Sequence, residues 1–134
     1  MTTYVDTSAL VKLYVDEPDS DIARDLVNAD PVLVTSWLTV VELRRNLAQL
    51  LAGPALVAAR RRAEDDLDAL ALVSLDEAAW RAAADIAEEL GVRSLDAVHL
   101  AAAKRLRIAD LVVATFDLRQ GQAARRLGFT VVGC

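Results

Sequence analysis

The sequence Leu-Val-Val-Ala-Thr at residues 111–115 indicates the fold more clearly than any other stretch of the chain. It is short, rich in β-branched residues and continuously apolar, which is typical of strands in a parallel sheet that is covered on both faces. Similar but weaker β-type runs occur at residues 3–5, 32–35, 71–75 and 130–132. The chain between these runs is long enough for helices, so the sequence predicts an α/β fold.

The segments between the strands have the composition and punctuation of helices. We expect helices over residues 8–15, 20–28, 37–52, 55–70, 77–90, 95–106 and 118–127. Gly53-Pro54 is expected to separate two of them, Asp76 and Ser94 to cap two others, and Gly91 and Gly128 to follow helix ends. Strands that alternate with helices predict a mainly parallel sheet with helices on both faces.

Length and composition predict a single domain over residues 1–134, with no membrane segment. The chain has 134 residues and is 54% hydrophobic, which is enough for one sizeable core. It contains no apolar run of the length that spans a bilayer, and its first residues do not have the pattern of a signal peptide. Cys134 is the single cysteine, so we expect a protein of the reducing cytoplasm.

The residues that the chain lacks exclude several chemistries. One cysteine and one histidine, His99, cannot form a Cys/His zinc site. There is no G-x-S-x-G nucleophile motif and no glycine-rich phosphate loop. The net charge of −5 argues against a broad basic surface that coats nucleic acid, and each arginine cluster is explained by a solvated helix face. A catalytic site in this chain must therefore consist mainly of carboxylates.

Four carboxylates are predicted near one edge of the sheet. Ligands of open parallel sheets bind beyond the carboxyl ends of the strands. Asp6 and Asp117 closely follow two predicted strands, Glu42 lies early in the helix after another, and Asp96 lies in a first helical turn. Asp6 and Asp117 could each be a helix cap, and Glu42 could pair with Arg45 on a solvated face.

Asp96 is harder to explain by surface position. It lies in the run LDAVHLAAA at residues 95–103, which is apolar on almost every side of a helix and so predicts burial. A buried carboxylate needs a cation or strong donors nearby. Two carboxylates about 4 Å apart repel by roughly 4 kcal/mol at an effective dielectric constant near 20, and oxygen ligands select hard cations. We therefore expect Mg²⁺ or Mn²⁺ at this edge, where it would activate water and stabilise charge on a phosphoryl group.

The same residues resemble the motifs of the PIN-domain ribonucleases, in particular the VapC toxins. The four matching segments, in order, are YVDTSAL at residues 4–10, Thr35-Ser36 followed by Val41-Glu42, SLDAVHLAAA at residues 94–103, and TFD at residues 115–117. Their order and spacing match, so the resemblance extends over the whole chain. It implies a three-layer α/β/α sandwich and a Mg²⁺- or Mn²⁺-dependent endoribonuclease.

The resemblance also implies roles for individual residues. Asp6 and Asp96 would be the principal metal ligands, Asp117 would complete the acidic site, and Glu42 would hold or deprotonate a water. Neighbouring hydroxyl groups would hydrogen-bond the carboxylates or a phosphate, namely those of Thr7, Ser8 and Thr115. His99 matches a residue common in the motif, and we expect it to be packed in the core and not to bind metal.

The partners that the resemblance implies are a structured RNA such as tRNA or ribosomal RNA, a small VapB-type antitoxin, and a second copy of the chain. Because they flank the predicted site in sequence, Arg44, Arg45 and Arg93 are our candidates for phosphate contacts. RNA binding through such contacts weakens as salt rises.

Two other functions are compatible with an Asp after the first strand. One is a Mg²⁺-dependent aspartyl-phosphate phosphatase or phosphotransferase. The haloacid-dehalogenase pattern requires a second Asp two positions on, where this chain has Ser8, and the acidic pair of a response regulator is also missing. The other is a non-catalytic module with the same fold, although such a module would have no need to keep four mutually repelling carboxylates.

Overall fold

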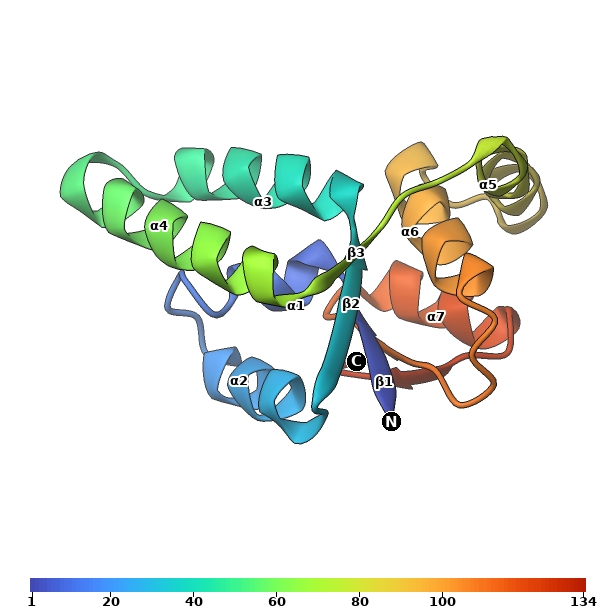
Figure 1. Ribbon diagram of the computed structural model, residues 1–134, viewed down its shortest axis with the longest axis horizontal. Coiled ribbons are helices and arrows are strands. Elements are labelled where there is room, and N and C mark those ends of the chain that lie inside the picture. Colours follow the sequence, from blue (N-terminus) through green and yellow to red (C-terminus); the bar gives the residue numbers. More distant parts are fainter.

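Five parallel strands form the centre of the protein in a computed structural model that describes residues 1–134 (Figure 1). The strands are β1 (Thr2–Val5), β2 (Val32–Ser36), β3 (Ala71–Val73), β4 (Val112–Ala114) and β5 (Thr130–Val132). Their order across the sheet is β3-β2-β1-β4-β5. Strand β1 is therefore central, and its Tyr4 lies opposite Val34 of β2 and Val113 of β4.

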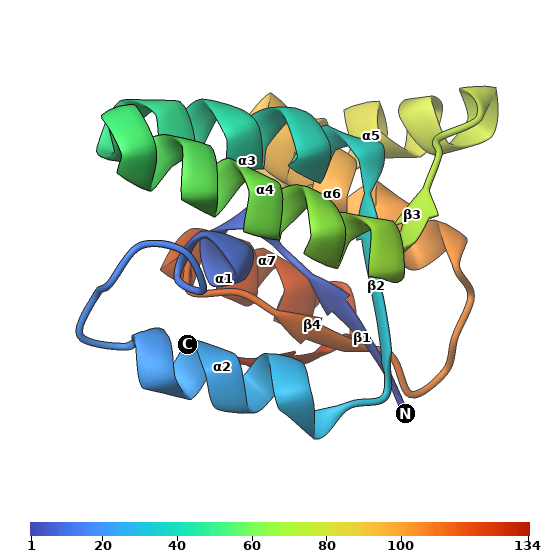
Figure 2. The ribbon, with the colours of Figure 1, turned by 60° about the vertical axis from the view of Figure 1, so that its left-hand side comes forward.

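Seven helices cover the two faces of this sheet. Those that follow the first two strands are α1 (Thr7–Val11), α2 (Ser20–Ala29), α3 (Trp37–Leu50) and α4 (Gly53–Ala69). The remaining helices are α5 (Glu77–Leu90), α6 (Ser94–Arg105) and α7 (Leu118–Arg126). In Figure 1, α1–α4 lie to the left of the strands and α5–α7 to the right, and Figure 2 shows the sheet between the two groups.

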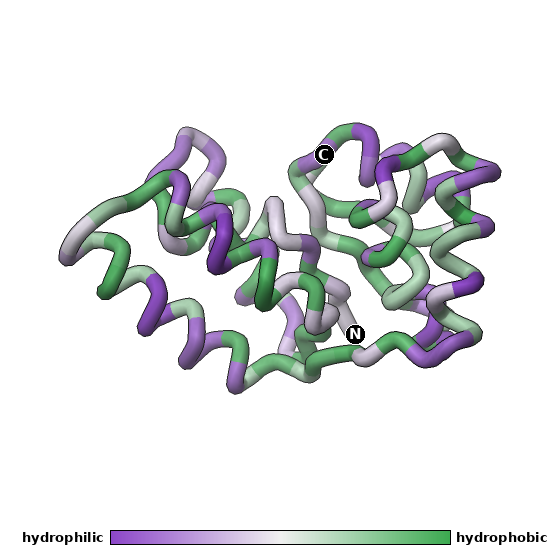
Figure 3. The backbone as a smooth tube through the Cα atoms, turned by 90° about the horizontal axis from the view of Figure 1, so that it is seen from above, coloured by the Kyte–Doolittle hydropathy of each residue, from purple (hydrophilic) through white to green (hydrophobic).

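The two faces of the sheet belong to two separate apolar clusters. Tyr4 packs in one cluster with residues of α5, α6 and α7, whereas its neighbour Val5 packs in the other with residues of α1, α3 and α4. Successive strand residues point to opposite faces, which places one of these two residues in each layer. Along the helices of both groups, hydrophilic and hydrophobic residues alternate, as Figure 3 shows. The predicted three-layer α/β/α sandwich is thus confirmed, with a sheet that is entirely parallel.

The differences from the predicted elements lie at the ends of strands and helices. Strand β3 ends at Val73, short of the predicted residue 75, and β4 covers only Val112–Ala114 of the predicted run 111–115. Helix α1 ends at Val11, before the predicted limit of residue 15, because Lys12 turns to bind Glu17 and Asp19 at 2.6 and 2.8 Å and holds the chain in a loop. The predicted cap at Ser94 is wrong, since Ser94 is already helical and Arg93 precedes the helix. None of the helices combines the length and the apolarity that crossing a bilayer requires.

Gly53-Pro54 does not form the gap between α3 and α4 that the sequence predicted. The chain is extended at Leu51 and Ala52, and Gly53 is the first residue of α4. Pro54 therefore lies in the first turn, where the missing N–H of a proline costs no helical hydrogen bond. The cap at Asp76 is confirmed, because its side chain accepts from the backbone N–H of Ala79.

Two leucines of α3 allow a test of the core between the sheet and helices α1, α3 and α4. Leu47 is 0% exposed, whereas Leu50 at the end of the same helix is 54% exposed. We expect Leu47→Ala to lower the free energy of unfolding by about 2–5 kcal/mol, because it leaves a cavity, and Leu50→Ala to change it by less than about 0.5 kcal/mol. Urea unfolding followed by circular dichroism measures both. Equal losses for the two variants would contradict the burial described for α3.

Candidate functional site

The carboxyl edge of the sheet brings together all four carboxylates that the sequence singled out. Asp6 follows the central strand β1, and Asp117 lies between β4 and α7. Glu42 projects from the second turn of α3, and Asp96 from the first turn of α6. The four carboxylates form two pairs, each bridged by a basic side chain. His99 lies between Asp6 and Glu42. Arg93 lies between Asp96 and Asp117.

Asp6 is held by hydroxyl groups and does not cap a helix. It is 6% exposed, and its Oδ2 accepts hydrogen bonds from Thr115 Oγ1 at 2.7 Å and Ser8 Oγ at 3.1 Å. The Ser8 hydroxyl is held in turn by the backbone N–H of Phe116 at 2.9 Å. Although Asp6 occupies the N-cap position of α1, its side chain makes no capping hydrogen bond. The capping interpretation is therefore wrong for Asp6, whose Oδ1 receives none of these bonds.

Glu42 is oriented by contacts across the layers of the fold. Its Oε1 accepts from Thr7 Oγ1 at 2.8 Å and from His99 Nε2 at 2.5 Å. Arg45 forms no ion pair with it, so a solvated pair on one helix face does not explain this residue. Burial raises the pKa of Glu42, but the hydrogen bonds from His99 and Thr7 and the charge of His99 outweigh burial and hold it below its usual range. Glu42 is therefore ionised at neutral pH.

His99 connects the hydrophobic core to the acidic site. It is 2% exposed, as expected for a packed histidine, yet both ring nitrogens have polar partners. Nδ1 lies 2.7 Å from Tyr4 Oη, and Nε2 lies 3.6 Å from Asp6 Oδ1 as well as beside Glu42. Burial lowers the pKa of His99, but the hydrogen bond to Glu42 and the charge of Asp6 outweigh burial and raise it. The sequence showed a polar residue in an apolar helix but gave no indication of these partners.

Arg93 is the cation that accompanies Asp96. Its Nε lies 3.1 Å from Asp96 Oδ2, and its second guanidinium nitrogen, Nη2, lies 3.1 Å from Asp117 Oδ2. Burial and the negative charges of Asp117 and Asp6 raise the pKa of Asp96, although Arg93 opposes them. The expectation that Asp96 needs a nearby cation is met here by an arginine of the same chain.

Asp117 has two roles at once. Its Oδ1 accepts from the backbone N–H groups of Arg119 and Gln120 at 2.9 and 3.2 Å and so caps α7, as the sequence suggested. Its Oδ2 faces Arg93, and its own backbone N–H donates to Thr115 Oγ1 at 3.1 Å. Since Thr115 also donates to Asp6, this threonine joins the central strand to the start of α7.

The donor set suits a hard cation, but the carboxylates are not gathered around one point. They offer only oxygen ligands, and burial together with the charges of Asp117 and Asp6 raises the pKa of Asp96, an effect that a bound cation opposes. No three acidic or histidine side chains lie close enough together to hold one ion in the arrangement described. Arg93 accounts for the separation of Asp96 from Asp117. It lies between the two carboxylates and must move before both can bind one metal ion.

The other two candidate arginines make no contact with the site. Arg44 and Arg45 are exposed on α3, and neither forms an ion pair. They share the helix of Glu42, so they remain at the periphery of the acidic group without touching it.

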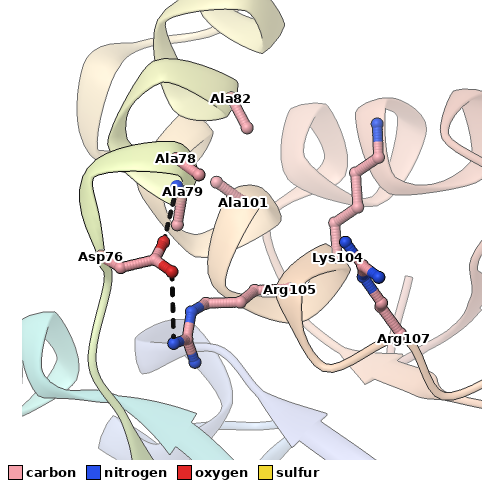
Figure 4. Close-up of a pocket in the computed structure, with 8 residues that line it drawn as sticks. All are labelled: Asp76, Ala78, Ala79, Ala82, Ala101, Lys104, Arg105 and Arg107. Atoms are coloured by element: carbon pink, nitrogen blue, oxygen red, sulfur yellow. Dashed lines mark hydrogen bonds and ion pairs between the residues drawn. The ribbon is translucent and has the colours of Figure 1, made fainter.

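A cavity of about 630 Å³ lies in another part of the molecule, between the start of α5 and the end of α6 (Figure 4). Its charged lining consists of Lys104, Arg105, Arg107 and one acid, Asp76, which lies 3.5 Å from Arg105. This cavity lacks the grouped carboxylates that hydrolysis with a hard cation requires. The chemistry therefore assigns the candidate site to the edge of the sheet.

Comparison with known proteins agrees with this geometry. The PIN-domain family model matches residues 3–126. Ribonuclease VapC46 of Mycobacterium tuberculosis is 37% identical over 129 residues, which cover 96% of this chain and 95% of that protein. The chain is also similar in structure to VapC20 of M. tuberculosis, described as a toxin that cleaves the sarcin–ricin loop, with a TM-score of 0.72, 21% identity and 98% of each chain covered. A further similar structure is that of VapBC-1 from nontypeable Haemophilus influenzae, with a TM-score of 0.67, 18% identity and coverage of 98% of this chain and 96% of the other.

The match to the family model includes every carboxylate of the site, and the curated relative is similar over nearly its whole length. The structural neighbours share the fold at lower identity. The chain belongs to the PIN-domain family, and within that family to the VapC-type ribonucleases.

Proposed function

We propose that this protein is a Mg²⁺- or Mn²⁺-dependent endoribonuclease and the toxin of a VapBC-type toxin–antitoxin pair. The observation that carries the proposal is the environment of the Asp6 side chain. This carboxylate is buried at the centre of the carboxyl edge, is oriented by two hydroxyl groups and caps no helix. Its relative VapC46 is named a ribonuclease, which supports RNA as the substrate of the same site.

In this proposal the carboxylates divide the work. Asp6 and Asp96 would be the principal metal ligands, and Asp117 would complete the site through water. The bound cation would act as a Lewis acid that makes water a better nucleophile and stabilises charge on the phosphodiester. Thr115 and Ser8 keep Asp6 oriented, because each donates to Oδ2.

Glu42 has the position and charge of a residue that orients or deprotonates the attacking water. It is ionised, and Oε1 already accepts from Thr7 and His99, so Oε2 remains for a water. His99 positions Glu42 from the core side and does not bind metal. Burial raises the pKa of Tyr4 above its usual value, so its hydroxyl stays protonated beside His99 Nδ1.

Structured RNA of the tRNA or ribosomal class is the proposed substrate. The support comes from VapC20, a structural neighbour that cleaves the sarcin–ricin loop. Arg44 and Arg45 remain candidates for phosphate contacts on the α3 side of the site, where they are exposed and free of ion pairs.

A small antitoxin and a second copy of the chain are the proposed protein partners, in the cytoplasm. The VapBC-1 structure supports the antitoxin. Helix α3 also presents exposed apolar side chains one turn apart, with Trp37 55% and Val41 66% exposed, as surfaces that bind other proteins do.

The central prediction is metal-dependent cleavage of RNA. Incubation of the isolated protein with total RNA in Mg²⁺ or Mn²⁺ is expected to produce discrete fragments, and EDTA to abolish them. Asp6→Asn and Asp96→Asn are each expected to lower the cleavage rate at least about 100-fold, because each removes a metal ligand. Asp85→Asn, an exposed acid of α5, is the matched control and is expected to cleave at the wild-type rate.

The same assay separates the alternatives. Cleavage that survives EDTA, or that survives both substitutions, contradicts the proposed mechanism. Phosphate release from phosphorylated small molecules without RNA cutting favours the aspartyl-phosphate enzymes, and metal-bound protein without any turnover favours a non-catalytic module.

Arg93 is predicted to oppose metal binding. Removal of its charge by Arg93→Gln leaves Asp96 and Asp117 without their counter-ion, so Mn²⁺ is expected to bind about fivefold more tightly because no cationic side chain competes with it. Calorimetric titration without RNA measures the affinity, and Arg81→Gln, which breaks an exposed ion pair with Glu77, is the control. Unchanged or weaker binding in Arg93→Gln would show that the arginine does not compete with the metal.

His99 is predicted to make stability depend on pH in the metal-free protein. Its pKa is raised on folding, so its contribution is fully present below the unfolded value of about 6.5 and is lost as pH rises through the folded pKa. In EDTA, the unfolding free energy of the wild type is therefore expected to fall above pH 6.5 relative to that of His99→Gln. Urea unfolding at several pH values tests this, and parallel curves for the two proteins contradict it. His99 is the only histidine in the chain, so no other imidazole titrates in this range.

A further inference from the structure

A cleft of about 260 Å³ adjoins the acidic site on the α7 side. It lies between the segment that connects α5 to α6 and the outer face of α7. Its charged lining comprises Arg93, Arg119, Arg126 and one carboxylate, Asp96. Because Arg93 and Asp96 also belong to the acidic site, the cleft and the site share a wall.

The charges in this cleft are not balanced by the protein. Arg93 is paired with Asp96 and Asp117. Arg119 and Arg126 are exposed on α7, and the side chain of neither forms an ion pair or a hydrogen bond. They lie about two helical turns apart and so on the same side of α7. The protein as a whole has a net charge of −5, whereas this cleft contains two guanidinium groups that no carboxylate neutralises.

The rest of the lining suits the non-ionic part of a nucleotide. Leu90, Val92 and Ala123 contribute apolar surface, and Gln122 contributes an amide. A guanidinium group matches the geometry of a phosphate through paired N–H donors, and it does so better than a lysine. An anionic ligand with an apolar portion therefore fits this cleft better than a bare anion does.

We propose that this cleft binds the RNA backbone at a phosphate next to the scissile one, with Arg119 and Arg126 as the contacts. The inference rests on the proposed function, because the position of the scissile phosphate is taken from the acidic site. Carboxylates alone repel RNA, and the cleft provides compensating positive charge directly beside them. Since guanidinium–phosphate contacts do not read bases, the cleft positions the strand and does not select its sequence.

Fluorescence anisotropy with a labelled single-stranded RNA pool of random sequence tests the proposal. Binding is measured in Ca²⁺ over a series of salt concentrations, with the RNA checked for integrity on a gel. Arg119→Gln and Arg126→Gln together are expected to raise the Kd about tenfold. They are also expected to reduce the slope of log K against log salt by about 1.4, since each phosphate contact on a single strand contributes about 0.7.

Arg60→Gln with Arg61→Gln is the matched control, because it removes two exposed charges from α4 in the other helical layer. Its Kd and salt slope are expected to equal those of the wild type. In cleavage assays, the α7 double variant is expected to show a raised KM with little change in kcat, and thermal unfolding and Mn²⁺ affinity like those of the wild type. A merely structural role for these arginines would instead lower the melting temperature.

The outcomes distinguish the cleft from the proposed function. If the wild type cleaves RNA and the α7 double variant binds it with unchanged Kd and salt slope, the cleft is not a phosphate site, although the nuclease proposal stands. If the wild type does not cleave RNA but the double variant still loses affinity, the proposed function is overturned and the cleft remains an RNA-binding surface. Equal losses in the α7 and α4 double variants would indicate a general charge effect and overturn the inference.

Discussion

Electrostatic repulsion among carboxylates at the carboxyl edge of a parallel sheet is the constraint on which the rest of this structure depends. The sheet order places β1 between β2 and β4, so Asp6 lies at the centre of that edge. Burial raises the pKa of Asp96, and the negative charges of Asp117 and Asp6 raise it further. Cations and strong donors must then surround the edge, and His99, Arg93 and the hydroxyl groups of Ser8 and Thr115 occupy these positions.

The compensating groups differ in how firmly they are fixed. His99 is buried and held on its far side by Tyr4, so the contact with Glu42 is as rigid as the core around it. The side chain of Arg93 is 68% exposed and is anchored only by its two carboxylate partners. The site is thus compensated through a buried histidine on the side of β1, α3 and α6, and through an exposed arginine where α6 and α7 begin. A metal can replace an exposed arginine at far lower cost than a buried histidine.

A carboxylate that caps a helix can also belong to the functional site. Asp117 caps α7 through one oxygen and joins the acidic group through the other, so the sequence pattern of a cap was right and yet incomplete. Asp6 has the sequence context of a cap, but its side chain turns towards Ser8 and Thr115. The difference arises because Thr115, from a strand far away in the sequence, offers Asp6 a hydrogen bond at 2.7 Å.

The sequence by itself determined the layers, the parallel sheet and the four acidic positions. Apolar periodicity and the placement of acids after strands are local patterns that can be recognised in short stretches of sequence. It also indicated that Asp96 requires a cation, since a carboxylate in an apolar helix is costly to bury. Arg93 lies three residues before Asp96, so their ion pair is itself local. Only the tertiary structure decided that Arg93 also reaches Asp117, that His99 links Tyr4 to Glu42, and that Arg119 and Arg126 share a cleft with Asp96. The contacts of His99 join residues far apart along the chain, and those of Arg93 with Asp117 and of the α7 arginines with the cleft depend on how α6 and α7 meet. Both depend on how strands and helices pack, which no local pattern specifies.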